Sequence, residues 1–299
     1  MRLAFAVVAL AVFSAPVVAQ EIEPRTYSNA PVGLNFLVAG YGYTEGGVAF
    51  DPTVPLTNAQ IEVHGAVLAY ARTFAVAGRS AKFDVSAPHA WLSGTADVAG
   101  VPASREVSGF GDPRLRVSVN LFGAPAKTLQ EFRSFQQDLI IGASLVAWAP
   151  LGQYDADRLV NIGTNRWALK PELGMSKSFG PWIFELSGGV TFYQDNDEYL
   201  GGTREQEPIY SIQSSLVRTF PKGIWASLSG TWYGGGRTTI NGVHKNDLQE
   251  NSRLGVVFSM PVNRHNSIKL MAHTGVSVRT GSDFDAVSIA WQYGWGGGL

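Results

Sequence analysis

The sequence predicts an all-β protein, a transmembrane antiparallel β-barrel of about twelve strands with short periplasmic turns and long extracellular loops. Three observations predict this fold. Apolar and polar residues alternate with a period of two, the connections alternate between short and long, and aromatic residues gather near the segment ends. Bacterial outer-membrane barrels combine these features, because one face of each strand meets lipid and the other meets the lumen.

Composition narrows the choice of fold and function. The 299 residues are 45% hydrophobic and 16% charged, with 23 Lys and Arg against 24 Asp and Glu and no Cys. High apolar content at almost zero net charge argues against a disordered chain. The absence of Cys excludes disulfides and Cys-ligated metal sites. The balanced charge argues against a nucleic-acid partner.

The N-terminal stretch predicts an export signal. A basic residue, an apolar run and small residues ending at Ala19 match the three regions of a secretory signal peptide. A membrane anchor would need about 20 apolar residues without a helix breaker, and Pro16 interrupts this run. We therefore expect residues 1–19 to be removed. Residues 20–299 should form a single barrel domain in the outer membrane of a Gram-negative bacterium.

Each strand is placed where apolar and polar residues alternate. Leu115 and Val117, for example, alternate with Arg114 and Arg116. This is the periodicity of a strand and not of a helix. In chain order the pattern recurs over twelve segments, at about 32–44, 61–74, 80–91, 109–122, 137–149, 165–179, 182–194, 208–220, 224–235, 251–262, 267–279 and 285–295.

The segment 267–279 shows how the faces are assigned. Ile268, Leu270 and Val276 share one face, which is expected to contact lipid, and Lys269 shares the other face with the remaining polar residues. A soluble β-sandwich would turn its apolar face inward instead and would bury its aromatics in mid-strand. A charged face repeated along so many strands fits a wet lumen better.

Connection lengths support the same topology. Short connections follow Phe74, Phe179, Phe220 and Val262, and long ones cover about 45–60, 92–108, 150–164, 195–207 and 236–250. The connection 123–136 breaks the rule because it is long where a short turn is due. The sequence leaves open whether a short helix forms there.

Aromatic residues form two groups. Those near the short turns are Phe74, Phe122, Phe179, Trp182, Phe220, Trp225 and Trp295, and those near the long loops are Tyr43, Trp148, Trp167, Tyr193, Trp232 and Tyr233. Two girdles of aromatic residues bracket the apolar band of a membrane barrel.

The candidate functional residues are the charged and polar groups expected in the lumen. They are Arg114, Arg116, Arg166, Lys170, Glu172, Glu185, Arg253, Lys269 and His273. Two interpretations stay open, an ion-pair network that fills the barrel and a constriction that sorts solutes by charge. With Asp84, Asp112 and Arg279 also assigned inward, basic groups outnumber acidic ones. This predicts a weak preference for anions.

No catalytic, metal or cofactor site is predicted. His273 shares a face with Ser267 and Ser277, but serines are common in these strands and do not define a catalytic triad. The acidic cluster 195–198 lacks the spacing of an EF-hand loop. The segment 109–113 lacks the third glycine and the helix of a nucleotide-binding loop.

Several strings of residues carry a family resemblance. They are Asn35–Leu37 with Gly40 and Tyr41, Gly46–Val48 with Asp51 and Pro52, Gly109–Pro113, Ala149–Asp155, and Asn161–Trp167 running into Lys170–Gly174. The chain after residue 19 resembles the outer-membrane transporter family associated with the meta-cleavage pathway of phenol degradation. The resemblance is most specific over 149–174. It implies a monomeric type of β-barrel that admits small hydrophobic or aromatic compounds.

These observations predict a passive outer-membrane channel or transporter for small hydrophobic or aromatic solutes, and not an enzyme. The alternative is a non-transporting barrel that has a structural or interaction role. The expected partners are membrane lipids and lipopolysaccharide, the barrel assembly machinery and small-molecule solutes. The sequence does not reveal whether the residues after Gln20 plug the pore.

Overall fold

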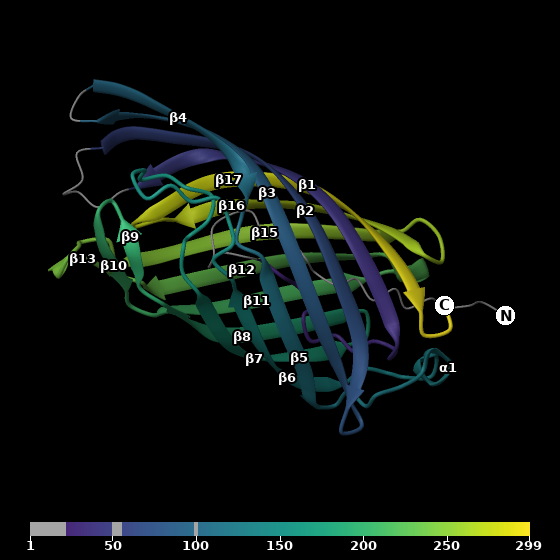
Figure 1. The fold of residues 1–299 in the computed structure, drawn as a ribbon. Helices are drawn as coiled ribbons and strands as arrows, with labels where there is room; N and C mark the ends of the chain where they lie inside the picture. Colours follow the sequence, from purple (N-terminus) through teal and green to yellow (C-terminus); the bar gives the residue numbers. More distant parts are fainter. Residues whose placement is uncertain (1–21, 50–55, 99–100) are drawn as a thin grey trace.

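The computed structural model describes residues 22–49, 56–98 and 101–299, which form a closed antiparallel β-barrel (Figure 1). The main sheet has thirteen strands, but β4 and β5 both pair with β3 at different heights, so the barrel wall has twelve positions. The barrel closes because the first strand pairs with the last. The predicted signal peptide, 1–19, lies outside the described residues. Among the described helices, none is long and apolar enough to cross a membrane.

Every predicted strand segment coincides with a strand of the wall. The strands are β1 (Leu34–Ala49), β2 (Leu56–Val76), β3 (Arg79–Val98), β4 (Val101–Phe110), β5 (Arg114–Phe122), β6 (Leu139–Trp148), β7 (Ala168–Phe179), β8 (Trp182–Tyr193), β11 (Ile209–Thr219), β12 (Trp225–Gly235), β15 (Gln249–Pro261), β16 (Asn266–Ser277) and β17 (Gly281–Gly296). The predicted twelve-stranded antiparallel barrel is therefore confirmed.

The short turns gather at one end of the barrel, together with the C-terminus and α1 (Leu129–Phe132) (Figure 1). In outer-membrane barrels the short turns face the periplasm, so we call this the periplasmic end and the opposite one the extracellular end. The β2–β3 turn shows why such connections can be short. Ala77 and Gly78 have φ of 48° and 75°, and left-handed conformations at both central residues match the twist of the paired strands.

The connection 123–136 contains the short helix α1. The Thr128 hydroxyl accepts a hydrogen bond from the Glu131 backbone N–H, and the Glu131 carboxylate accepts one from the Thr128 backbone N–H at 2.8 Å. This reciprocal capping satisfies two free backbone donors at the start of a helix. The sequence shows the capping pair, Thr and then Glu three residues later, but its alternation of faces does not place a helix here.

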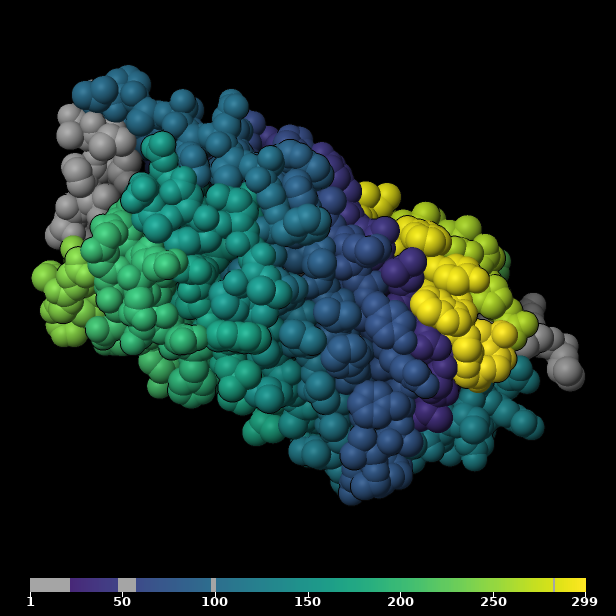
Figure 2. Space-filling model, in the orientation of Figure 1, coloured from purple at the N-terminus to yellow at the C-terminus, as the bar shows by residue number. Residues whose placement is uncertain are grey.

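Two predicted long loops are largely strand, and this corrects the sequence analysis. Residues 45–49 and 56–60 lengthen β1 and β2, and most of 92–108 belongs to the hairpin of β3 and β4. This hairpin projects past the neighbouring wall at the extracellular end, in blue in Figure 2. Strands that leave the lipid still pair through their backbones, but water meets both of their faces. The apolar alternation that reveals a membrane strand is lost there.

The predicted strand 109–122 is also interrupted. β4 ends at Phe110 and β5 begins at Arg114. Between them Pro113 has no backbone N–H to donate to a neighbouring strand, while the Gly111 N–H donates to the Pro88 carbonyl at 2.9 Å. The wall therefore bends at this point.

The predicted loops 195–207 and 236–250 form a second, four-stranded sheet. Its strands are β9 (Asn196–Tyr199), β10 (Gly202–Gln206), β13 (Thr238–Ile240) and β14 (Val243–His244). The pairing of β10 with β13 joins the two loops. The sequence predicts them as separate loops because strands of two to five residues are too short for a periodic pattern.

The faces of the wall invert the usual order of a globular protein. On β16, Leu270 is 46% exposed and Val276 is 57% exposed, whereas Lys269 is only 8% exposed. Apolar side chains cover the outside and polar ones are buried inside, as lipid outside and a polar lumen require. A small apolar cluster, which includes Leu34 and Phe36, also packs inside the barrel at the periplasmic end.

Candidate functional site

The lumen contains the residues that precede the first strand. Ile22, Glu23, Tyr27 and Ala30 are all buried, with exposed fractions of 8% or less. Residues 22–30 precede β1, and none of them belongs to a strand. We call them the plug segment because they lie inside the barrel. The question that the sequence leaves open is answered, since a stretch after Gln20 does enter the barrel.

Glu23 is the centre of a buried ion-pair cluster. Its carboxylate pairs with Arg114 at 2.6 Å and with Arg116, and a second nitrogen of Arg114 pairs with Asp84 at 3.1 Å. Arg114 has no exposed surface. Both predicted arginines therefore neutralise an acid of the plug segment. Breaking a buried pair by removing one partner costs about 3–5 kcal/mol, because it leaves an uncompensated charge.

Two wall carboxylates hold the plug segment through different contacts. Glu185 accepts a hydrogen bond from the Arg25 backbone N–H at 2.5 Å and another from the Ser176 hydroxyl at 3.1 Å. Glu172 accepts one from the Tyr27 hydroxyl at 3.0 Å and pairs with Lys170 at 2.8 Å. The predicted Lys170–Glu172 pair thus exists, and it faces the plug segment.

The Tyr27 ring fits against two glycines of the wall. Gly142 on β6 and Gly174 on β7 are directly opposite each other. A Cβ atom at Gly142 would lie 2.2 Å from Cδ1 of Tyr27, and one at Gly174 would lie 2.1 Å from its Cε2. Any larger residue at either position would occupy the volume of the ring.

Next to this charged side, β11 and β12 form a neutral part of the wall. The inward side chains of β11 and β12 carry no charge, and Ser215 and Ser229 bond to each other at 2.8 Å. At the boundary between the two sides lies Trp225, whose ring centre is 5.4 Å from the Arg25 guanidinium carbon and 5.8 Å from Nζ of Lys269. The plug segment contacts both parts of this electrically asymmetric lumen, since the Glu23 backbone N–H donates to the Gln213 side chain on β11 at 3.1 Å.

The nine predicted residues divide into two groups. Arg114, Arg116, Lys170, Glu172, Glu185 and Lys269 surround the plug segment. Arg166, Arg253 and His273 contact other parts of the barrel, although His273 lies beside Gly255 and close to Ile22. Arg253 donates to the Phe284 carbonyl at 2.6 Å, and the His273 ring meets the Phe284 ring edge-on at 5.9 Å. These nine residues therefore do not form one ring.

Arg166 belongs to the connection between β6 and β7. Its guanidinium bonds to Gln206 and lies 4.5 Å from the centre of the Tyr193 ring. Burial, together with the nearby charge of Arg204, lowers its pKa to about 10. Arg279, expected in the lumen, is instead half-exposed and faces Glu250 at 3.8 Å. It follows β16 directly, where the wall ends and the alternation of faces no longer applies.

The connection 149–167 folds inward and narrows the extracellular half. Ile162 packs against Val63, Ala90 and Leu92 on the inner faces of β2 and β3. Asp112, predicted as a lumen charge, holds this connection in place. Its two carboxylate oxygens accept hydrogen bonds from the Gly152 N–H at 3.0 Å and from the Thr164 N–H and hydroxyl at 2.8 and 2.6 Å.

This anchoring gives a physical role to the strings that carry the family resemblance. A Cβ at Gly163 would lie 2.8 Å from Cα of Gly152, and one at Gly109 would lie 2.7 Å from Cβ of Gln153. The strings at 109–113 and 149–167 therefore fit together without space for side chains at these glycines.

Glu23, Arg25 and Tyr27 are functional residues that the sequence pattern does not predict. They precede the first strand and have no periodic pattern, so nothing local marks them as buried. The available signal was indirect. Gly142 and Gly174 occupy inward positions, where glycine leaves space for another group.

Comparisons with known proteins agree with this architecture. The family model described as "Putative MetA-pathway of phenol degradation" matches residues 42–291. The COG4313 outer membrane channel from Pseudomonas putida F1 is similar, with a TM-score of 0.76 and 19% identity over 92% of this chain and 100% of that chain. No curated protein matches the chain significantly.

Two autotransporter barrels are similar at a lower level. The transport unit of AIDA-I from Escherichia coli has a TM-score of 0.51 and 8% identity, over 93% of this chain and 94% of that chain. The beta domain of the Bordetella autotransporter BrkA has a TM-score of 0.51 and 10% identity, over 88% and 100%. At such identities these structures show a shared fold.

Proposed function

Because this chain belongs to the phenol-degradation family whose model covers most of its length, we propose that it is an outer-membrane channel for small hydrophobic or aromatic solutes. The apolar outer band and the fold support a position in the outer membrane, where lipid surrounds the barrel. Contacts with lipopolysaccharide and with the barrel assembly machinery are part of the proposal.

The observation that carries this proposal is that the barrel wall is complete by itself, while separate segments obstruct its lumen. The wall pairs around its whole circumference without the plug segment. The plug segment and the connection 149–167 then obstruct the lumen through side-chain contacts. The plug segment precedes β1 and can leave the lumen without breaking a backbone hydrogen bond of the wall. Passage is therefore gated, and we propose that the solute gradient alone drives it.

Apolar surfaces inside the barrel support a hydrophobic solute. In the extracellular half, Val63, Leu92 and Ile162 form one inner cluster. Nearer the periplasmic end, Ile183, Val217, Trp225 and Val257 form another, with Met271 against it. A small aromatic molecule would meet apolar surface on both sides of the charged layer.

The buried ion pairs favour the alternative, a barrel with a structural or interaction role. A lumen whose charges are all satisfied needs no solute. The two functions differ in what happens when the plug segment is removed. A channel then conducts, whereas a structural barrel loses stability without gaining selective passage.

The test uses the refolded mature protein and a variant that lacks residues 22–28. Conductance is measured in planar bilayers, and flux of benzoate and of a sugar is measured in liposomes at neutral pH, where lipid alone retains benzoate. We expect low conductance from the unmodified protein and faster benzoate than sugar flux from the variant. A folded variant that passes neither solute would contradict the channel.

A further inference from the structure

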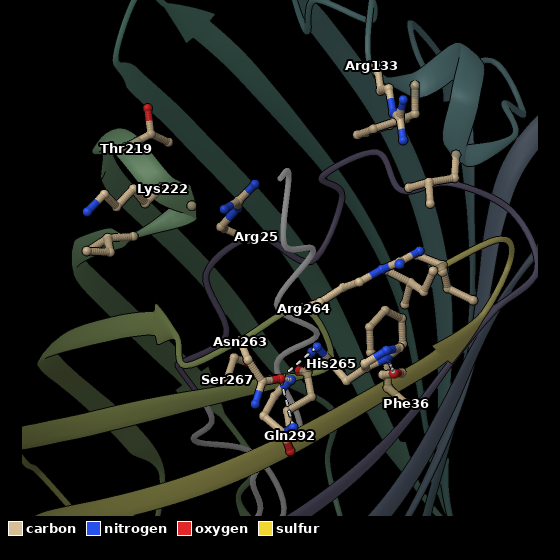
Figure 3. A pocket seen from close by; sticks show the side chains of 18 of the residues that line it. Arg25, Phe36, Arg133, Thr219, Lys222, Asn263, Arg264, His265, Ser267 and Gln292 are labelled. Atoms are coloured by element: carbon tan, nitrogen blue, oxygen red, sulfur yellow. Dashed lines mark hydrogen bonds between the residues drawn. The ribbon is translucent and has the colours of Figure 1, made fainter. Parts of the chain in front are cut away.

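We propose that the periplasmic mouth of the barrel is a binding site for a small aromatic carboxylate. This inference deepens the proposed channel function by naming the solute class. A cavity of about 480 Å³ lies between the plug segment and three periplasmic connections (Figure 3). Its volume is within the range of about 300–1,000 Å³ that is usual for small-molecule sites.

The lining of this cavity is basic. Its cationic or titratable side chains are Arg25, Arg133, Lys222, Arg264 and His265. No Asp or Glu side chain among the described residues lines it. Leu299 is also part of its wall, and its side chain packs against the apolar cluster around Phe36. Such an excess of positive charge in a concave site raises the local concentration of anions.

Arg25 is the central anchor. Its Nε donates to the Ser28 hydroxyl at 3.2 Å, and its backbone N–H bonds to Glu185. Within the described part of the chain, the two terminal nitrogens of its guanidinium have no hydrogen bond or ion pair. A guanidinium presents two parallel N–H groups to a carboxylate, which makes this pairing stronger and more directional than a single hydrogen bond.

The other cations have different roles. Arg264 donates to the Gly298 carbonyl at 3.1 Å, and Nδ1 of His265 lies 2.9 Å from the Gly294 carbonyl, so both brace the wall. The side chains of Arg133 and Lys222 have no such partner among the described residues. Arg133 follows α1 and Lys222 lies in η1 (Pro221–Gly223), on separate connections at the mouth. They can attract an anion that Arg25 then holds.

Aromatic side chains supply the second half of the recognition. Phe36, Phe132, Phe135 and Phe220 line the same cavity. Phe132 and Phe135 stack with their ring centres 5.3 Å apart. Further aromatic surface lies beside Arg25, where the Trp225 ring centre is 5.4 Å from the guanidinium carbon. A flat ring that carries one carboxylate can contact these surfaces and the Arg25 guanidinium together.

The test is an equilibrium titration of the full mature protein in detergent, with benzoate as the probe. Benzyl alcohol and benzylammonium keep the ring and replace the anion by a neutral or a cationic group. We expect saturable benzoate binding that is at least tenfold tighter than that of either analogue. Equal binding of benzylammonium would overturn the proposal, because it would show that the ring alone is recognised.

Two variants locate the site. Arg25→Gln removes the guanidinium and should weaken benzoate binding at least tenfold, and Arg133→Gln, on an exposed connection, should weaken it severalfold. The matched control is Arg79→Gln, an exposed arginine of the β2–β3 turn outside the cavity. Unchanged binding by both test variants would overturn the site.

Flux separates this inference from the proposed channel function. If benzoate binding is absent but a small neutral aromatic still crosses, the site is wrong and the channel stands. If benzoate binds through Arg25 but no solute crosses any variant, the site stands and the channel is wrong.

Discussion

Single residues connect the plug segment to the wall, and a substitution of Glu23 tests this connection most directly. Glu23→Gln removes one of the two carboxylates that neutralise Arg114 and Arg116. The loss is expected to weaken insertion of the plug segment by about 3–5 kcal/mol, the cost of an unpaired buried charge. Single-channel conductance should rise while the barrel stays folded. Glu131→Gln, at the periplasmic helix, is the control, and equal conductance of the two variants would contradict this role.

The space for Tyr27 gives a second residue-scale prediction. Gly174→Ala places a methyl group 2.1 Å from the Tyr27 ring, so the ring must leave its position. Overpacking of this kind costs about 1–3 kcal/mol. Conductance should again rise, with unchanged barrel folding on gels. Gly188→Ala is the matched control, because its nearest contact would be 3.6 Å away; a rise in both variants would refute the fit.

The expected contact of Leu270 with lipid gives a third residue-scale prediction. Leu270→Arg should reduce the yield of assembled barrel, since Arg on the lipid face costs about 2–4 kcal/mol at mid-membrane and about 0–1 near the interfaces. Val262→Arg, outward beside a periplasmic turn, should assemble almost normally. Met271 would be the inward control suggested by sequence alone, but it packs against an apolar cluster. Equal yields of assembled barrel from the two variants would show that Leu270 does not lie at mid-membrane.

At the scale of elements, the connection 149–167 depends on Asp112. Asp112→Ala removes three hydrogen bonds, and a bond to a charged group contributes about 1.5–3 kcal/mol. Added protease should then cut within 150–164 in intact cells faster than in the unmodified protein. Asp157→Ala, exposed in the same connection, serves as control. Cleavage at Gly180–Pro181 instead would reverse the topology.

Elements could be predicted from sequence where lipid imposes the pattern. Inside the membrane band, one face of each strand must be apolar, so the alternation predicts a strand at each of the twelve positions of the wall. Beyond the band this constraint ends, so the sequence pattern predicts loops where β1 to β4 extend past the membrane. The plug segment is invisible for another reason. Its burial depends on partners such as Arg114, which is 91 residues away from Glu23.

At the scale of the whole molecule, the excess of basic groups predicted for the lumen does not lie there. Arg114 and Arg116 are neutralised by acids, so they do not bias a permeating ion while the plug segment is in place. Among the described residues of the periplasmic mouth, Arg133 and Lys222 have no ion-pair partner. The sequence could therefore predict which side chains face inward, but not which of them remain unpaired.

The position of these cations at the periplasmic mouth predicts the ion preference of the channel. We expect the reversal potential under a KCl gradient to indicate weak anion preference, and the double variant Arg133→Glu with Lys222→Glu to shift it toward cations, because charge at a narrow mouth governs which ion enters. Arg79→Glu is the control. An unchanged potential in the double variant would show that ions bypass the cavity.

The pairing of the first strand with the last has a consequence for biogenesis. The barrel closes only when β17 pairs with β1, whereas the partners of the plug segment on β3, β5, β7 and β8 lie on strands whose own pairing does not require this closure. An unfinished sheet would otherwise expose a polar, charged concave face. Glu23 and its neighbours can cover that face before closure, so that the chain carries its own temporary counter-surface during folding.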